Sequence, residues 1–395
     1  IFGRNFFSYA VAVNIIDASY YIGFIALGVT FVIIAGGIDL SVGTVMMCAA
    51  IVGGTAFTQY GWSMEATLVL IMVVGTAFGF FNGFIIAYFG MPPFIVTLGT
   101  MMISMGVGSM VSGVQSAAFP SRSAEGGWFK QLFKYISDER QIVPTGGIIL
   151  FIVVIIGHII LTRTKMGRYF YAMGSNKEAA RLSGIDVRKY TMMTYVLAGF
   201  TAGIGGIAFA ATYTTVIPAR GQGFELIAIA AAVIGGTSLS GGVGSVWGTL
   251  IGIFIMSVLS NGLPAMGLQA HYQNFFTGVV VIGAVGLDIY RAKKSSVVKL
   301  LSPSEAYRTE QLKRIEELKQ EMKQTGHGER KKEIQAEIRR VSKEMKQTYR
   351  TMKSSEHEEK ARRAEEEKKA ESEFEQVLDE QALNHSADEP GDRNK

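Results

Sequence analysis

Long stretches without a charged residue constrain this chain most. Four such runs cover Ala66–Ser121, Gln141–Thr162, Tyr190–Ala219 and Leu226–Leu287. A helix that crosses a bilayer needs about 20 mostly apolar residues, so the longest runs must fold back at least once. Buried core helices of a soluble protein, or a cleaved secretory leader, do not explain apolar runs that recur through the chain. The pattern therefore predicts an all-α, polytopic membrane bundle.

The C-terminal part of the chain has a different composition. Residues 1–302 hold 17 Lys+Arg and 10 Asp+Glu, whereas residues 303–395 hold 21 and 23. An apolar body is therefore joined to a charged, water-soluble tail. We predict a transmembrane domain at 1–294, a linker at 295–302, a charged helical hairpin or coiled coil at 303–380, and a disordered end at 381–395.

Hydropathy predicts nine membrane segments. Because the chain does not begin with Met, we expect that an N-terminal piece is missing and that the full chain has ten spans. The seventh segment is short, and glycines follow it directly. The predicted segments lie at about 20–38, 41–58, 66–89, 94–112, 146–162, 191–212, 224–237, 243–260 and 274–290.

Basic loops predict the orientation of these segments. Residues 163–189 hold seven basic residues against only Glu178 and Asp186, so this loop should be cytoplasmic by the positive-inside rule. Residues 291–294 are also basic, which places the C-terminal tail in the cytoplasm. Counting backwards places residues 113–145 outside.

The predicted outer stretch contains "GWFKQLFKYI". Trp128, Phe129, Leu132, Phe133 and Ile136 would fall on one face of a helix there, with Lys130 and Lys134 on another. This pattern is typical of an amphipathic helix at the membrane interface. The alternative is a platform for an external partner.

Heptad spacing predicts the form of the tail. A first apolar stripe ends at "TGHG", and a second stripe follows a 4-3-4-3-4 spacing, which is a short heptad seam. Two helices joined at Gly326–Gly328 are therefore expected. The two stripes consist of Leu312, Ile315, Leu318 and Met322, and of Ile334, Ile338, Val341, Met345, Thr348 and Met352.

The sequence holds no recognisable catalytic or metal-binding pattern. It has no phosphate-binding loop, no nucleophile elbow and no metal-binding histidine pair, and Cys48 is its only cysteine. We therefore predict no catalytic residue, no metal and no cofactor in this chain. If ATP drives it, another chain must bind the ATP.

Charged residues inside the apolar body are candidate functional groups. Arg220 and Glu225 flank "GQGF" and could pair with each other. Asp39 stands alone in "GGIDLSVG", between two apolar runs on the predicted inner side. An Asp before an apolar helix can cap that helix and mark a membrane boundary. The alternative is that Asp39 lines the inner gate of a translocation path.

Four stretches together resemble the permease subunits of sugar ABC importers of the ribose, galactose and xylose type. Their order and spacing also fit that family, over about residues 5–294. The four stretches are "GVTFVIIAGGIDLSVG" at 28–43, "GMPPFIVTLGTMMISMGVG" at 90–108, "TKMGRYFYAMGSNKEAARLSGIDVRKY" at 164–190 and "ELIAIAAAVIGGTSLSGGVGSVWGTLIG" at 225–252.

The resemblance implies which residues matter. The family's coupling motif maps onto Glu178, Ala179, Ala180 and Gly184, in a loop that would dock in an ATPase cleft. The family signature maps onto residues that shape a helix junction beside the translocation path. These signature residues are Gly36, Gly37, Asp39, Ser41 and Gly43.

The resemblance also implies a function and partners. It predicts a permease in the bacterial inner membrane that carries a monosaccharide delivered by a periplasmic or lipoprotein sugar-binding protein. A cytoplasmic ABC ATPase and a second permease copy or paralogue would complete the importer, and no nucleic acid is expected as a partner. The alternatives are a branched-chain amino acid permease, a secondary transporter, or a membrane scaffold that acts through its tail.

Overall fold

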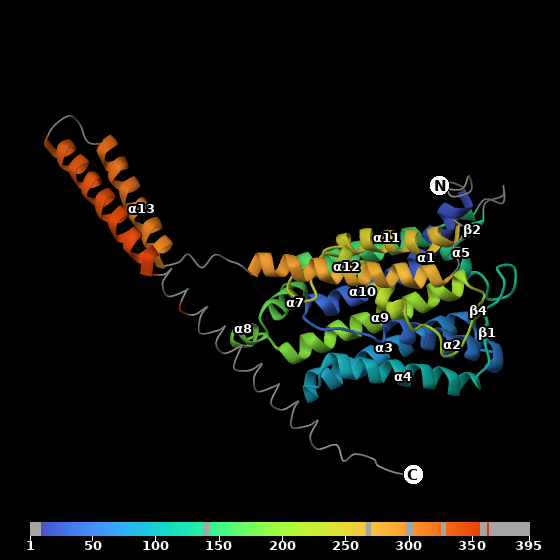
Figure 1. The fold of residues 1–395 in the computed structure, drawn as a ribbon. Coiled ribbons are helices and arrows are strands. Elements are labelled where there is room, and N and C mark those ends of the chain that lie inside the picture. The colour runs from blue at the N-terminus through green and yellow to red at the C-terminus, as the bar shows by residue number, and fades with distance from the viewer. Residues whose placement is uncertain are drawn as a thin grey trace, which may run out of the picture. The chain divides into compact units, whose positions relative to one another are not determined.

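The computed structural model describes residues 9–136, 142–265, 270–296, 303–324, 329–355 and 362. The chain divides into two compact units, Ile1–Ser295 and Ser296–Lys395. In the first unit the long helices run side by side as a bundle (Figure 1). The predicted helical membrane bundle is confirmed at this level, and the count of nine crossings stays a prediction.

Within the described ranges, six helices are long and apolar enough to cross a membrane. Each contains a stretch of 18 residues with at most two charged side chains. The helical hydrogen bonds satisfy the backbone, so such a stretch exposes little polar surface to lipid. They are α1 (Tyr9–Ile34), α2 (Val42–Tyr60), α3 (Met64–Phe89), α4 (Pro93–Ser112), α6 (Gly146–Arg163) and α9 (Val187–Thr212).

Six further helices lie in the described part of this unit. The short helices α7 (Lys165–Ser175) and α8 (Lys177–Leu182) connect α6 to α9, and α5 (Phe129–Phe133) precedes α6. The last apolar helices are α10 (Phe224–Ile234), α11 (Val246–Ala265) and α12 (Ala270–Ser296). Helix α10 ends at a Gly235–Gly236 turn, where Gly236 has φ +90°, a conformation that favours glycine.

The first membrane segment begins earlier than predicted. Helix α1 starts at Tyr9, so the predicted start at residue 20 is wrong, and Asp17 lies inside the helix. The Asp17 side chain is buried and forms an ion pair with Lys134. A buried carboxylate is tolerated where a cation compensates its charge, and this pair explains why the apolar helix can include Asp17.

Helix α1 lies at the centre of the bundle. Of the 18 residues that form its most apolar stretch, 89% are buried, against 33% for the corresponding stretches of α3 and α4. Beside it, α3 and α9 pack through facing glycines: a Cβ added at Gly79 would lie 2.3 Å from the Tyr195 carbonyl oxygen and 2.9 Å from the Gly199 Cα. Only glycine permits backbones to approach so closely, and Gly75, Gly79 and Gly83 repeat at the four-residue spacing that lets membrane helices pack in this way.

The segment between α4 and α6 differs from the predicted amphipathic helix. Helix α5 spans only five residues, and short strand pairs flank it, with β1 (Ala117–Ala118) against β4 (Thr215–Val216) and β2 (Tyr135–Ile136) against β3 (Ile142–Val143).

The faces of α5 also differ from the prediction. Phe129 and Phe133 are buried together with Lys130, whereas Trp128 and Leu132 are exposed. Burial, and to a smaller extent the charge of Arg122, lowers the pKa of Lys130. The predicted division into one aromatic face and one basic face is therefore wrong, because the bundle end covers both aromatic and basic side chains.

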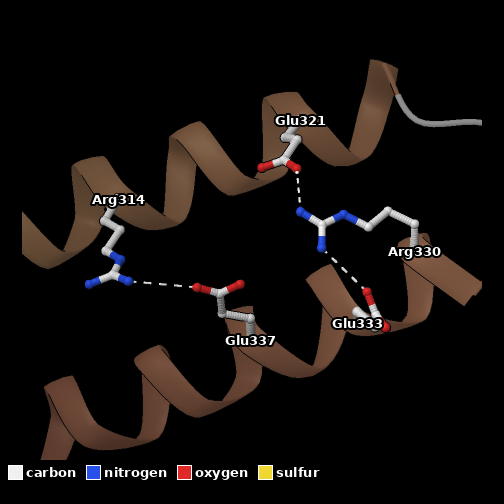
Figure 2. A network of polar contacts seen from close by, with 5 residues as sticks. All are labelled: Arg314, Glu321, Arg330, Glu333 and Glu337. Atoms are coloured by element: carbon white, nitrogen blue, oxygen red, sulfur yellow. Dashed lines mark hydrogen bonds and ion pairs between the residues drawn. The ribbon is translucent and has the colours of Figure 1, made fainter.

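The second unit contains a helical hairpin. Helix α13 (Pro303–Gln324) lies beside the helix of residues 329–355, and their apolar positions Ile315, Ile334 and Met345 are buried. Figure 2 shows the ion pairs that join the two helices, Arg314 with Glu337 and Arg330 with Glu321. The "TGHG" joint and the predicted disordered end at 381–395 lie outside the described residues.

Candidate functional site: a polar junction and an exposed loop helix

The predicted signature "GGIDLSVG" joins α1 to α2: residues 36–41 form a non-helical turn, and Val42 and Gly43 begin α2. Helix α1 ends at Ile34, and Gly36 adopts φ +80°, which breaks the helix. Gly242, in the turn before α11, donates its N–H to the Ile34 carbonyl oxygen at 2.9 Å. A chain break inside an apolar bundle needs such partners, because lipid offers none to free backbone groups.

A hydrogen-bond chain holds this turn. The Ser41 N–H and Oγ both donate to Asp39 Oδ1, at 2.8 and 2.7 Å. Asn82 Nδ2 of α3 donates to Ser41 Oγ at 2.9 Å, and Thr100 Oγ1 of α4 donates to Asn82 Oδ1 at 2.6 Å. All four side chains are buried. Ser41 occupies the N-cap position of α2, so the Asp39 carboxylate orders the residue that begins the helix.

The same turn contacts α9. Tyr195 is fully buried, and its hydroxyl group donates to the Ile38 carbonyl oxygen at 3.3 Å. A Cβ added at Gly37 would lie 2.6 Å from this hydroxyl oxygen, so the Tyr195 ring requires a glycine there. The turn is thus held by α3, α4 and α9 together.

A double-mutant cycle should detect the hydrogen bond that joins Ser41 of the turn to Asn82 of α3. We expect Ser41→Ala and Asn82→Leu each to lower the free energy of unfolding by about 1–3 kcal/mol, since each removes two buried side-chain hydrogen bonds. The double variant should lose about 1 kcal/mol less than the two effects combined, because the bond between the two side chains is lost only once. Reversible denaturation in detergent measures these free energies.

Thr76→Val is the matched control for Asn82→Leu. Thr76 lies on the same helix, and its Oγ1 donates to Met72 O within that helix. Combined with Ser41→Ala, it should show additive effects. Additive effects for Ser41→Ala with Asn82→Leu would contradict the coupling inferred from the 2.9 Å contact.

A cavity of about 330 Å³ lies beside the glycines of the turn. Gly36 and Gly37 line it together with Pro92 of the α3–α4 connection and with Asn176 and Lys177 at the start of α8. The glycines of the predicted turn and the residues directly before the predicted coupling motif therefore border one cavity.

The predicted coupling residues lie on and after α8. Asn176 caps this helix by accepting the Ala179 N–H at 2.9 Å, and Glu178 forms an exposed ion pair with Arg181 at 2.9 Å. Ala180 is buried, and Gly184, with φ +83°, ends the turn. Helix α8 is therefore anchored on its Ala180 side and presents charged side chains to its surroundings.

The exposed side of α8 also carries an apolar group. Leu182 has 84% of its surface exposed. A second cavity, of about 350 Å³, lies between the end of α3 and this helix, and Tyr88, Lys177 and Arg188 are among its lining residues. Helix α8 thus presents an apolar side chain, Leu182, together with the charged side chains of Glu178 and Arg181.

Two other acidic residues of the apolar body, Glu225 and Asp288, accept backbone hydrogen bonds. Glu225 is buried, and its Oε1 accepts the Gly223 N–H at 2.8 Å, so among the described residues it does not pair with Arg220. Asp288 of α12 accepts the Leu239 N–H at 2.9 Å and the Ser238 hydroxyl at 3.2 Å.

Sequence reasoning missed Asn82, Thr100 and Tyr195 as members of this site, and all three are buried. A weak signal existed for one of them: Asn82 is the only asparagine in the charge-free run Ala66–Ser121. The others are ordinary residues of apolar helices, and only the packing of separate helices brings them to the turn.

The chain matches known proteins over most of the first unit. The family described as "Branched-chain amino acid transport system / permease component" matches residues 11–285. The ribose import permease protein RbsC of Escherichia coli K12 is 37% identical over 289 residues, which cover 72% of this chain and 87% of that protein.

Two further relatives are named for other sugars. The fructose import permease protein FrcC of Rhizobium meliloti is 32% identical and covers 73% of this chain and 80% of its own length. The xylose transport system permease protein XylH of Escherichia coli K12 is 31% identical, with 71% and 85% covered. No solved structure matches the chain significantly. The family match and these identities establish that the chain belongs to this family of transport-system permease components.

Proposed function

We propose that this chain is the membrane-spanning permease subunit of an ATP-driven ABC importer and forms the path for a monosaccharide. Its relatives are named for ribose, fructose and xylose, which supports a sugar over an amino acid. A periplasmic or lipoprotein binding protein would deliver the sugar. A separate ATPase subunit would bind ATP, and a second permease copy or paralogue would complete the path.

The observation that carries this proposal is the exposed helix α8 beside the 330 Å³ cavity. A short helix that is capped by Asn176 and anchored through Ala180 can move as a unit when a docked partner moves. Its Glu178 and Arg181 would contact the ATPase. Since the same cavity borders Gly36 and Gly37, a displacement of α8 would reach the turn through neighbouring atoms.

The turn would act as the inner gate of the path. Gly36, Gly37, Asp39 and Ser41 lie in the non-helical segment between α1 and α2, and Gly43 lies in the first turn of α2. Helix breaks inside the membrane commonly border the substrate route of transporters. A series of hydrogen bonds supports a closed gate, because it ties this segment to α3 and α4. It runs through Asp39, Ser41, Asn82 and Thr100.

The proposed orientation follows from the basic loop. Nine crossings of the inner membrane would place residues 163–189 and the charged tail in the cytoplasm, and residues 113–145 outside. The loop would then face the ATPase, and the segment with α5 would face the binding protein. Neither a cofactor nor a nucleic acid has a role in this scheme.

Uptake by the reconstituted importer tests the proposal. The permease, its ATPase and its binding protein would be placed in proteoliposomes with labelled ribose, fructose, xylose or leucine. We expect ATP-dependent accumulation of one or more sugars and none without ATP. Leucine uptake without sugar uptake would favour the amino acid alternative, and ATP-independent uptake would favour a secondary transporter.

A further inference from the structure

Two helices begin inside the bundle and meet at their first turns. Helix α2 begins beside Ser41, which is bonded to Asn82, about two helical turns before the end of α3. This separation corresponds to roughly 10 Å of helix. The start of α10 lies at the same place, since a Cβ added at Gly43 would lie 2.5 Å from the Gly221 carbonyl oxygen and 3.1 Å from the Glu225 backbone nitrogen.

The approach is reciprocal and requires glycine on both sides. A Cβ added at Gly221 would lie 2.5 Å from the Gly43 carbonyl oxygen, and Gly221 has φ +106°. These two backbones therefore touch with no side chain between them. The contact joins α2 to the segment that precedes α10, and it leaves no open passage between these two elements.

An unsatisfied carboxylate lies at this contact. Glu225, in the first turn of α10, is 4% exposed, and its Oε1 accepts the Gly223 N–H. Its Oε2 accepts no hydrogen bond from any other residue that the structure describes. This oxygen faces Gly43: a Cβ there would lie 2.7 Å from it. A buried acceptor without a donor is unfavourable and marks a place where a donor can bind.

We propose that the Gly43–Gly221 contact is a closure of the translocation path and that Glu225 is the substrate-contacting group at this closure. The inference rests on the proposed function, because it names a residue of that path. When α2 and α10 separate, Glu225 Oε2 becomes accessible from the opened gap. A monosaccharide carries several hydroxyl donors and no net charge, so one hydroxyl group can donate to this oxygen while the sugar passes.

The chemistry of the site fits a neutral polyol. Hydrogen bonds to a carboxylate are stronger than bonds between neutral groups, so a single acceptor suffices to favour a hydroxylated solute over an apolar one. Gly43 also lies two residues after Ser41, so the closure is continuous with the proposed gate.

Glu225→Gln tests the inference in the complete importer. The change keeps the shape of the side chain and removes its charge. At saturating sugar-loaded binding protein, we expect sugar uptake per ATP hydrolysed to fall about tenfold, while ATP hydrolysis itself persists. Glu65→Gln is the matched control, because Glu65 also lies in the first turn of a membrane helix but is exposed, and its uptake should remain unchanged.

The outcomes separate this inference from the proposed function. If the wild-type importer transports no monosaccharide, the proposed function fails. If it does and Glu225→Gln matches it in uptake per ATP, only the role of Glu225 fails. Should Glu225→Gln not fold, Glu225→Asp keeps the charge and withdraws the carboxylate by one methylene group. A reduced uptake per ATP in that variant supports the inference, and wild-type uptake overturns it.

Discussion

Replacing Gly79 by alanine is expected to remove most of the folded permease. The added methyl group would lie 2.3 Å from the Tyr195 carbonyl oxygen and 2.9 Å from the Gly199 Cα, both of which are backbone atoms of α9. Backbone atoms inside a packed bundle cannot turn aside as a long side chain can, so α3 and α9 must separate. We expect a loss of about 3 kcal/mol in the free energy of unfolding.

The effect should extend to the site, because the same stretch of α9 positions Tyr195 against the turn at Gly37 and Ile38. Thermal unfolding in detergent, followed by the amount of monodisperse protein, measures the loss. Sugar uptake per folded molecule should fall as well, since α9 begins directly after the loop of α8.

Gly99→Ala provides the control with the same added methyl group. Gly99 lies on α4, is exposed, and a Cβ there meets no atom within 4 Å. Alanine is favoured over glycine in a helix by about 1 kcal/mol, so this variant should be as stable as the wild type or slightly more stable. Equal effects of Gly79→Ala and Gly99→Ala would contradict the close packing of α3 on α9.

Most helices of the first unit could be predicted because their apolar runs are bounded by polar or glycine residues. Helices α3 and α4 begin and end within two residues of the predicted segments 66–89 and 94–112. The predicted start of α1 was wrong because a charged residue such as Asp17 usually marks the end of an apolar membrane segment. Its compensating charge, Lys134, is distant in the sequence and becomes its neighbour only through folding.

Periodicity also failed for the short segment around α5. Helical spacing assigns residues to faces but does not say which face the rest of the protein covers. Here the strand pairing of Ala117 with Val216 ties the preceding residues to a second loop, and Lys130 is buried with its aromatic neighbours. A face pattern over one turn and a half of helix is therefore weak evidence.

The site could be predicted in part. The lone Asp39 and its glycines indicated a helix junction, and the structure places a non-helical turn there. The residues that support the junction come from other helices and could not be inferred from local spacing. Glu225 shows the limit clearly, because its sequence neighbour Arg220 suggested an ion pair, whereas its carboxylate lies against Gly43.

Reversing the charge of Glu178 is expected to abolish ATP-driven uptake without unfolding the permease. Glu178 forms only an exposed ion pair with Arg181, with about 70% of each side chain exposed, and such pairs contribute less than about 1 kcal/mol to stability. At a docking surface, a reversed charge meets like charge and costs several kcal/mol. We therefore expect uptake by Glu178→Lys to fall at least about tenfold, measured in proteoliposomes that contain the ATPase and binding protein.

The charge-swapped double variant, Glu178→Lys with Arg181→Glu, decides what Glu178 does. It restores an ion pair within α8 at the same spacing, so a role limited to the shape of α8 would be rescued. The partner would still meet the two charges in reversed positions, so a role in docking would not be rescued. Asn176 still caps α8 in this variant, and Ala180 still anchors it. A persistent loss of uptake in the folded double variant therefore means that the partner binds these charges in their original positions. Full recovery of uptake would show instead that Glu178 serves only the helix, and the ATPase would then have to dock elsewhere on the permease.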